Sequence, residues 1–269
     1  MTMVDLVADV GESFGAYRLG DDVALLDVLT SANVACGFHA GDPRVMDSTV
    51  AQCAERGIAV GAHPSFPDLV GFGRRTMDLT RDEICSDVLY QVGALHAFAV
   101  SHGTRISHVT PHGRLGNLVV TDDRYAHGVL DAVLRYDRDL LIVTQEGRLA
   151  ELAREAEVRV VLLGLADRAY NADGTLVSRQ NPGAVITDPD LVVDRVVRMV
   201  RDGSVVAIDG SEIAAPCDSV LLHGDTPGSV ELAQRIRRGL DAAGVNVAPM
   251  SQVLDARQLL SVGNSADRT

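Results

Sequence analysis

The sequence contains no tryptophan, and aromatic residues make up only 4% of it. A core without many large rings has to be built from Val, Leu, Ala and Ile, and 269 residues are enough to bury one large core. No linker, repeat or low-complexity tract divides the chain. We therefore predict a single domain over residues 1–269, with a disordered tail from about residue 255.

Cysteine is also scarce. The four copies form no CxxC pair and have no regular spacing, which argues against both a disulfide framework and a structural zinc site. Free, buried thiols are the expectation for these residues. They are Cys36, Cys53, Cys85 and Cys217.

Basic residues are outnumbered by acidic ones, and the net charge is -13. A protein that binds a phosphate backbone needs clustered basic side chains, so we expect no nucleic-acid partner. The N-terminus has neither the basic start nor the apolar core of a signal peptide. No apolar run approaches the roughly 20 residues that span a bilayer. We expect a cytoplasmic protein with no membrane partner.

Three common motifs are absent. The sequence has no GxxxxGK[ST] motif of a P-loop and no GxSxG motif of a nucleophile elbow. It also has no GxGxxG after its first predicted strand, where a dinucleotide-binding fold would carry one. If a nucleotide binds, it binds at a site of another kind.

Short apolar runs alternate with longer amphipathic stretches, as in a parallel α/β protein. Helix starts are predicted at Asp42-Pro43 and at the capping box Thr80–Glu83. Longer excursions are predicted at Arg168–Gly183, a loop, and at Ile208–Asp218, a hairpin. The eight predicted strands are Val4–Asp9, Ser31–Cys36, Ile58–Ala62, Ile106–Thr110, Leu140–Thr144, Val158–Leu163, Ser219–Leu222 and Val245–Ala248.

These strands fit either a closed (β/α) barrel of the TIM type or an open doubly wound sheet. Polar, glycine-rich segments follow many of the strands rather than one or two; they are DVGES, CGFHAGDP, AHPSFPD, TPHG, ADRAY and HGDTPG. A barrel gathers all its strand ends at one mouth, whereas an open sheet concentrates its site at one switch point. The pattern therefore favours the barrel.

Four histidines come directly after predicted strands: His39, His63, His112 and His223. One such histidine is most often structural, but four at corresponding positions would converge on one pocket. Carboxylates that could activate water or coordinate a metal accompany them. These are Asp9, Glu12, Asp42, Asp167 and Asp225, of which Asp42 is better explained as a helix cap and Asp225 is equally well explained as a loop-closing residue.

The remaining charged candidates are arginines. The segment Gly71–Arg75 offers Arg74 and Arg75 to an anionic group, although a solvated basic loop explains them equally well. Arg168 beside Asp167 has the same standing. The other histidines are expected to be solvated; they are His96, His102, His108 and His127.

Taken in order, several of these segments resemble the LamB/YcsF family of lactam-utilisation proteins, from about Val4 to Pro249. The segments are ADVGESFGAY, TSANVACGFHAGDP, GAHPSFPDLVGFGRR, ADRAYNADGTLVSR and LLHGDTPG. The resemblance implies a barrel of the glycoside hydrolase/deacetylase superfamily. It also implies ATP-dependent opening of the lactam ring of 5-oxo-L-proline to L-glutamate, with the chain as the A component of a 5-oxoprolinase that works together with subunits B and C.

The chain departs from the family pattern at several positions near predicted strand ends. It has Val7 where the family has Asn, Thr110 where it has Lys, and Leu163 where it has Glu. Arg114 and Gly116 also stand in place of Ala and Tyr. Such changes fit either an altered substrate or weakened catalysis.

Three hypotheses follow. The first is ATP-dependent hydrolysis of 5-oxoproline or a close cyclic amide, with Asp9, Glu12 and His112 as the catalytic core. The second is a metal-dependent, deacetylase-like hydrolase acting alone, with a divalent metal as its cofactor. The third is a non-catalytic relative that binds a small molecule or regulates a partner. Substrate contacts are assigned to His39, His63, Arg74, Arg75, Asn117, Asp167, Arg168, His223 and Asp225, of which His39, His63 and Asp167 could instead hold the metal.

Overall fold

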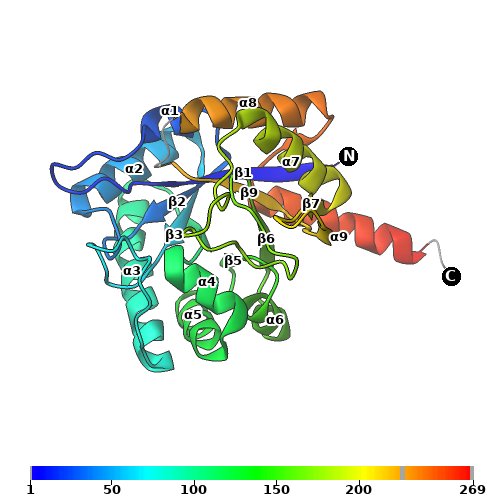
Figure 1. The fold of residues 1–269 in the computed structure, drawn as a ribbon. Helices are drawn as coiled ribbons and strands as arrows, with labels where there is room; N and C mark the ends of the chain where they lie inside the picture. Colours follow the sequence, from blue (N-terminus) through cyan, green and yellow to red (C-terminus); the bar gives the residue numbers. More distant parts are fainter. Residues whose placement is uncertain (1, 225–227, 267–269) are drawn as a thin grey trace.

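The computed structural model describes residues 2–224 and 228–266, and its centre is a closed barrel of seven parallel strands (Figure 1). Each strand pairs with the next around the ring, and the pairing of β9 with β1 closes it. The predicted barrel is therefore confirmed. The wall strands are β1 (Met3–Val10), β2 (Ser31–Ala35), β3 (Ala59–His63), β4 (Ile106–Val109), β5 (Leu141–Thr144), β6 (Val160–Leu165) and β9 (Ser219–Leu222).

The eighth predicted strand forms but does not enter the wall. This strand, β10 (Asn246–Val247), pairs with Met3 and Val4 at the start of β1. The next part of β1, from Asp5 to Ala8, pairs with β9. Because β9 already closes the ring, β10 only extends the sheet beyond the closed part of β1.

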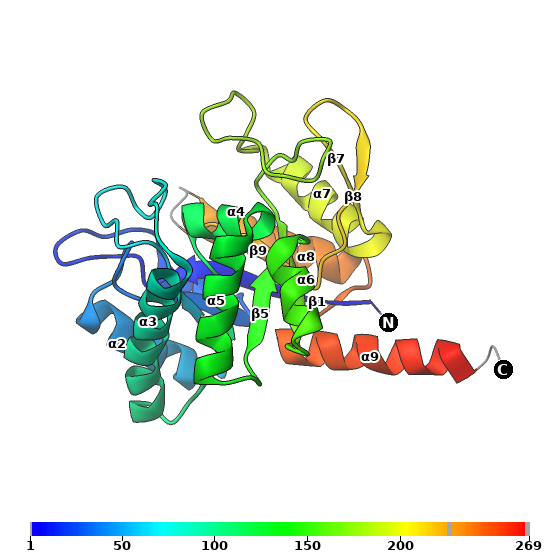
Figure 2. The ribbon, with the colours of Figure 1, turned by 90° about the horizontal axis from the view of Figure 1, so that it is seen from below.

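Helices cover the outside of the barrel (Figures 1 and 2). Asp42 caps α2 by accepting from the backbone N–H groups of Arg44 and Val45, and Thr80 with Glu83 forms a capping box at the start of α3. Both predicted helix starts are thus confirmed. The helices are α1 (Asp22–Leu26), α2 (Pro43–Arg56), α3 (Arg81–Ser101), α4 (Gly113–Thr121), α5 (Asp123–Tyr136), α6 (Arg148–Glu155), α7 (Pro189–Asp202), α8 (Ser229–Ala242) and α9 (Met250–Ala266).

The last helix differs from the sequence prediction, which placed a disordered tail from about residue 255. The structure has helix α9 through Ala266 instead. Its first residue, Met250, is buried among barrel-interior side chains such as Val7 and Leu141. Figure 2 shows α9 at the end of the barrel opposite the long loops. The first residues of this helix therefore pack against the barrel interior at that end.

Among the described residues, α3 alone has the length and mean hydropathy of a membrane span. In this structure it lies against the barrel beside α5. Its buried positions include Ile84, Val88 and Leu95 in the main core, while Tyr90 is exposed. This one-sided burial is typical of an outer barrel helix.

The excursions predicted after β6 are present. The antiparallel pair β7 (Ser204–Val206) and β8 (Glu212–Ala214) forms the expected hairpin, which begins a few residues earlier than predicted. The loop after β6 runs from Leu165 to α7. Both rise above the same end of the barrel in Figure 2.

The barrel interior has two chemically different sides. Strands β5, β6 and β9, with Val7 of β1, contribute the side chains that we call the apolar half: Val7, Leu141, Val143, Val161, Leu165 and Leu221. Strands β1 to β4 contribute the buried side chains that we call the polar half: Asp9, Asn33, His63 and His108. The chemistry-bearing groups are therefore concentrated on one arc of the wall.

A buried carboxylate lies at the other end of β1. Asp5 is fully buried and accepts hydrogen bonds from the hydroxyls of Thr30, Ser31 and Ser219, at 2.8, 2.5 and 2.6 Å. Burial raises the pKa of Asp5 to about 6, although the three hydroxyls oppose the increase. These bonds join β1 to both of its wall neighbours, so Asp5 has a structural role.

The substitution Asp5→Asn is expected to change how stability depends on pH. The folded protein holds the Asp5 proton more tightly than the unfolded chain does, so ionising this group destabilises the fold as the pH rises from about 4 to about 6. Relative to the variant, the wild-type free energy of unfolding should fall by up to about 3 kcal/mol across that window. Urea denaturation at each pH measures the difference, and a constant difference would contradict this account.

Candidate active site

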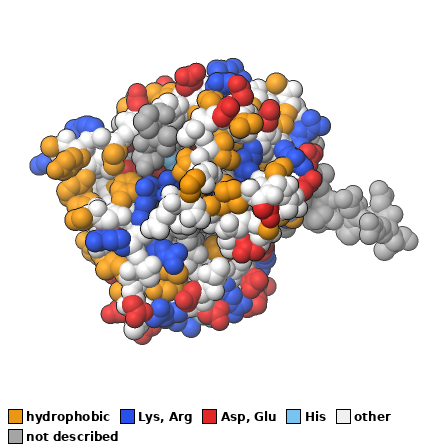
Figure 3. Space-filling view, viewed as in Figure 1, with side chains coloured by type: hydrophobic (Ala, Val, Ile, Leu, Met, Phe, Trp, Pro, Cys, Tyr) orange, Lys and Arg blue, Asp and Glu red, His pale blue; other side chains and the backbone are white. Residues whose placement is uncertain are grey.

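A cavity of about 620 Å³ opens at the carboxyl ends of the barrel strands. Side chains of the polar half line it together with Leu163, Leu165 and Leu221 of β6 and β9. Four arginines also line it, and Figure 3 shows basic side chains beside the central hollow on this face. The arginines are Arg74, Arg114, Arg168 and Arg179. A cavity of this size and mixed lining is typical of a small-molecule site.

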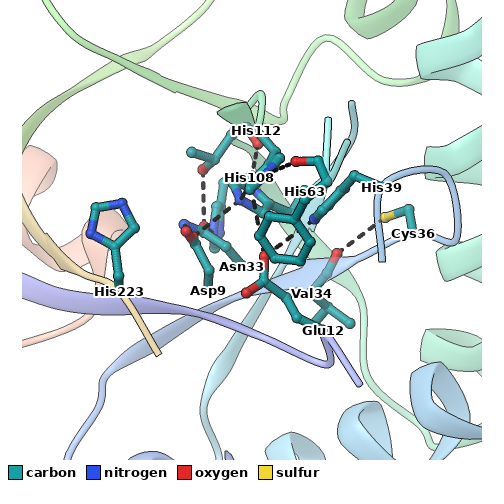
Figure 4. A network of polar contacts seen from close by, with 12 residues as sticks. Asp9, Glu12, Asn33, Val34, Cys36, His39, His63, His108, His112 and His223 are labelled. Carbon is teal, nitrogen blue, oxygen red and sulfur yellow. Dashed lines mark hydrogen bonds and ion pairs between the residues drawn. The ribbon is translucent and has the colours of Figure 1, made fainter. Parts of the chain in front are cut away.

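Asp9 lies at the floor of this cavity, near the end of β1 (Figure 4). It is 5% exposed, and its Oδ1 accepts a hydrogen bond from Asn33 Nδ2 at 3.0 Å and lies 3.2 Å from His63 Nε2. Burial acts to raise the pKa of Asp9, but the adjacent His63 and other histidines outweigh it and hold the pKa below its usual value. Asp9 is therefore a buried anion in contact with the cavity.

Asn33 was not predicted from the sequence. It is fully buried on β2, and its amide nitrogen donates to Asp9. Its Oδ1 accepts from Thr110 Oγ1 at 3.0 Å and lies 3.0 Å from His108 Nε2. One amide thus fixes Asp9 and joins three strands. A polar side chain between the apolar Ala32 and Val34, inside a predicted buried strand, was the available signal.

His108 is a correction to the sequence analysis, which expected it to be solvated. It lies within β4, is fully buried and contacts Asn33. Burial, followed by the neighbouring His63, lowers the pKa of His108 to about 3, so the ring is neutral. Gly61 on β3 makes room for this ring. His108 therefore supports the site from inside the wall.

His63 and His112 are each held by a backbone carbonyl. His63 Nδ1 donates to the Thr110 carbonyl at 2.6 Å, and His112 Nε2 donates to the Phe72 carbonyl at 3.0 Å. The two remaining nitrogens, Nε2 of His63 and Nδ1 of His112, are 2.9 Å apart. Burial, then His39 and His63, lowers the pKa of His112 well below its usual value. The His112 ring is therefore neutral.

Glu12 and His39 complete this cluster. His39 Nε2 lies 3.3 Å from Glu12 Oε1, and the His39 ring stacks on the His112 ring with 3.8 Å between centroids. Burial, then His63 and Arg74, lowers the pKa of His39 well below its usual value. One ligand atom from each of Glu12, His39, His63 and His112 lies within 4.8 Å of the others. The structure thus brings together five of the predicted residues, these four and Asp9.

A second polar group lies at the rim formed by β6 and β9. His223 Nδ1 lies 2.8 and 2.9 Å from the two carboxylate oxygens of Asp167, and His223 Nε2 lies 2.9 Å from Arg179 Nη2. Arginine only donates, so His223 accepts from Arg179 and donates to Asp167. Burial raises the pKa of Asp167, but the hydrogen bond from His223 outweighs it and the net pKa is lowered. Arg179 was not predicted, because its place in a long loop gave no signal.

The other predicted residues have varied positions. Asn117 lines the cavity, as does Arg74, whose guanidinium lies over the Phe72 ring. Arg168 also lines it, but its guanidinium donates to the carbonyls of Val177 and Ala184 and so holds the loop after β6.

Arg75 and Asp42 have other partners in the structure. Arg75 is bonded to Asp68 and does not line the cavity. Asp42 has the role of helix cap described above. Asp225 lies outside the described residues. The structure therefore brings neither Arg75 nor Asp42 into the cavity.

The family model for the LamB/YcsF family matches residues 4–255, nearly the whole chain. The chain belongs to the LamB/YcsF family. Curated relatives also match nearly the whole chain. A protein of Thermococcus onnurineus, named as the A subunit of 5-oxoprolinase, is 51% identical over 252 residues, which is 93% of this chain and 99% of the relative. A relative of the same name from Streptomyces avermitilis is 52% identical over 247 residues, which is 91% of this chain and 99% of the relative.

Solved structures agree with this assignment. The LamB/YcsF chain resembles the lactam utilization protein from Thermus thermophilus, with a TM-score of 0.86 and 44% identity, over 91% of this chain and 99% of that one. The peptidoglycan deacetylase PdaC from Bacillus subtilis has a TM-score of 0.52 and 14% identity, over 99% of this chain and 96% of that one. The second likeness shows only a shared fold.

Proposed function

We propose that this LamB/YcsF protein is the A subunit of a 5-oxoprolinase, which opens the lactam amide of 5-oxoproline or a close cyclic analogue with ATP. The observation that carries the proposal is the near-complete coverage, at about half identity, of relatives that bear this name. The name implies further subunits, and we take the partners to be subunits B and C.

The cavity chemistry supports a small cyclic amide. Such a ring has one polar amide edge and one hydrocarbon edge. The polar half of the barrel would face the amide edge, and the apolar half, with Leu165 and Leu221, would face the methylene groups. Asp9 is the one carboxylate among the described residues that line the cavity. The ring would therefore be bound with its reacting bond near Asp9.

Hydrolysis of an amide needs a base for the attacking water and an activated carbonyl. Asp9 would accept the proton of the water. Phosphorylation of the amide oxygen by ATP would make an unreactive lactam susceptible to water. The sequence contains no lysine, so arginines such as Arg74, Arg114 and Arg179 would stabilise the phosphate at the cavity. Glu12 and His112 complete the proposed catalytic core.

A reconstitution assay tests this proposal. The full-length chain is mixed with subunits B and C, ATP and 5-oxoproline, and the formation of glutamate and ADP is followed. We expect stoichiometric glutamate and ADP only when all components are present. Absence of turnover would end the assignment, provided that an active relative is substituted for this chain in a parallel mixture and does form glutamate.

A second candidate function is amide hydrolysis without ATP. One observation favours it: the buried cluster of Glu12, His39, His63 and His112, whose donor atoms suit a metal. The same assay, run with the chain alone and without ATP, tests it on 5-oxoproline and on acetylated amines. Hydrolysis that needs neither ATP nor partners and is lost on chelation would favour this candidate over the first.

The substitution Asp167→Asn is expected to weaken substrate binding rather than the chemical step. Asparagine cannot accept the charge-assisted hydrogen bond that His223 Nδ1 shares between the two carboxylate oxygens, so His223 would lose its fixed orientation toward Arg179 at the rim. Loss of such a contact costs about 1.5–3 kcal/mol, which predicts a KM about 10- to 100-fold higher. Steady-state kinetics of the reconstituted enzyme measure it, and a fall in kcat at constant KM would contradict the assignment.

A further inference from the structure

Carbonyl oxygens fix the hydrogen positions on two facing imidazoles. His63 Nδ1 contacts the carbonyl of Thr110, and His112 Nε2 contacts the carbonyl of Phe72. A carbonyl oxygen only accepts, so each of these nitrogens carries its ring's hydrogen. When both rings are neutral, His63 Nε2 and His112 Nδ1 therefore both carry lone pairs.

These two nitrogens face each other across 2.9 Å, a normal hydrogen-bond distance, yet neither can donate to the other when both rings are neutral, because neither carries a hydrogen. Carboxylate oxygens add further negative charge. Asp9 Oδ1 lies 3.2 Å from His63 Nε2, and Glu12 Oε1 lies 3.8 Å from His112 Nδ1. All four side chains are buried. A buried group of acceptors at this spacing requires a positive species between them.

The third imidazole distinguishes a metal ion from a shared proton. A proton between His63 and His112 would satisfy only that pair and Asp9. His39 Nε2 also faces this group, 3.3 Å from Glu12 Oε1, and its buried Nδ1 has no hydrogen-bond partner among the described residues. One ion can contact all of these ring nitrogens and the Glu12 carboxylate oxygen at once, which a proton cannot.

The spacing and the surroundings of the donors also suit a metal. Bonds of 2.0–2.1 Å to a tetrahedral ion place its ligand atoms about 3.4 Å apart. The observed separations include 2.9, 3.3 and 3.8 Å, and all four ligand atoms lie within 4.8 Å of one another, so small side-chain movements would bring them onto one ion. Metal-binding histidines usually donate their other ring N–H to a carbonyl or carboxylate, as His63 and His112 do here.

We propose that one divalent transition-metal ion of the Zn²⁺ class binds at the barrel mouth to four side chains: Glu12, His39, His63 and His112. Three imidazole donors favour Zn²⁺ or Co²⁺ over Mg²⁺, which prefers oxygen ligands. Such an ion would act as a Lewis acid beside Asp9. Metal binding can be measured without substrate, so this proposal and the proposed reaction succeed or fail separately.

The test uses the full-length chain, stripped of metal with a chelator and then titrated with Zn²⁺, Co²⁺ or Mg²⁺. Calorimetry and elemental analysis should give one Zn²⁺ per chain, and Co²⁺ should produce the visible absorption of a nitrogen-ligated ion that Zn²⁺ abolishes. Mg²⁺ should not compete. Zn²⁺ should also raise the Tm, as expected for a ligand that binds only the folded state.

Variants locate the site. We expect His39→Gln and His112→Gln to weaken Zn²⁺ binding at least about 100-fold. Loss of a residue that merely orients a metal ligand already costs up to about 100-fold in affinity, and loss of the ligand itself should cost no less. His96→Gln, on the exposed surface of α3, is the matched control and should bind like the wild type. Circular dichroism checks that each variant folds.

Three results would overturn the proposal. They are a wild-type chain that binds no stoichiometric Zn²⁺, an equal loss of binding in His96→Gln, and ¹⁵N spectra that show an imidazolium at His63 unchanged by Zn²⁺. The first and third use the wild-type protein, so a variant that fails to fold does not affect them.

Discussion

The substitution Asp9→Asn should lower kcat of the reconstituted 5-oxoprolinase by about 100- to 10,000-fold, the usual contribution of a positioned base. Asparagine has nearly the same shape, and its oxygen can still accept from Asn33. The change therefore removes the charge and the ability to take a proton while leaving the cavity nearly intact. KM should change little, because Asp9 would act on the attacking water rather than hold the ring.

Initial rates of glutamate formation measure this effect. Asp209→Asn, at an exposed turn where Asp209 contacts Ser211, is the matched control and should keep wild-type kinetics. A kcat for Asp9→Asn within tenfold of the wild type would show that another group activates the water. Because subunits B and C are present in every assay, the comparison isolates the contribution of this residue.

The substitution Gly61→Ala should lower the free energy of unfolding by about 3–5 kcal/mol. A Cβ at this position would lie 2.0 Å from His108 Nε2, inside a ring that is fully buried. His108 would have to move, which breaks its contact with Asn33 and leaves buried polar atoms unpaired. The cost combines overpacking with a lost buried hydrogen bond.

Urea denaturation measures this loss. Gly93→Ala is the control, since Gly93 lies in α3 with no atom within 4 Å of the added Cβ. The control should be unchanged or more stable by up to about 1 kcal/mol, because alanine favours a helix. Equal stability of the two variants would show that the β3–β4 contact tolerates the methyl group. If Gly61→Ala folds, it should also lose activity, since Asn33 holds Asp9.

The barrel and the place of its site were predictable because both follow from local patterns. Apolar runs alternate with capped helices, and polar segments follow the strands, so the topology alone brings Asp9, His39, His63 and His112 to one mouth. Here the order of elements determined the position of the side chains.

Other features depend on contacts that no local pattern encodes. The register between β3 and β4 shifts by one residue after Val60, so that Gly61 lies opposite His108 and Ser107 is passed over. The regular alternation of inward and outward side chains along a strand does not reveal that the His108 ring is fully buried. Likewise, the turn at Gly71 lets Arg75 pair with Asp68 rather than enter the cavity.

The count of wall strands was unpredictable for a similar reason. β10 has the apolar character of its neighbours, but β9 reaches β1 first and completes the ring. The tail was misjudged: a disordered segment was predicted where Met250 anchors a helix. Ring closure and anchoring are properties of the assembled barrel.

The two halves of the barrel interior come from different strands, which separates what the site does from what fits into it. The reactive groups lie on β1 to β4 or just after them, whereas the hydrocarbon wall comes from β5, β6 and β9 with only Val7 added from β1. Substitutions at Val143 or Leu165 can thus enlarge or narrow the room for a ring without touching an imidazole or carboxylate. Descendants of such a barrel could acquire new ring sizes by gradual mutation while their chemistry stayed the same.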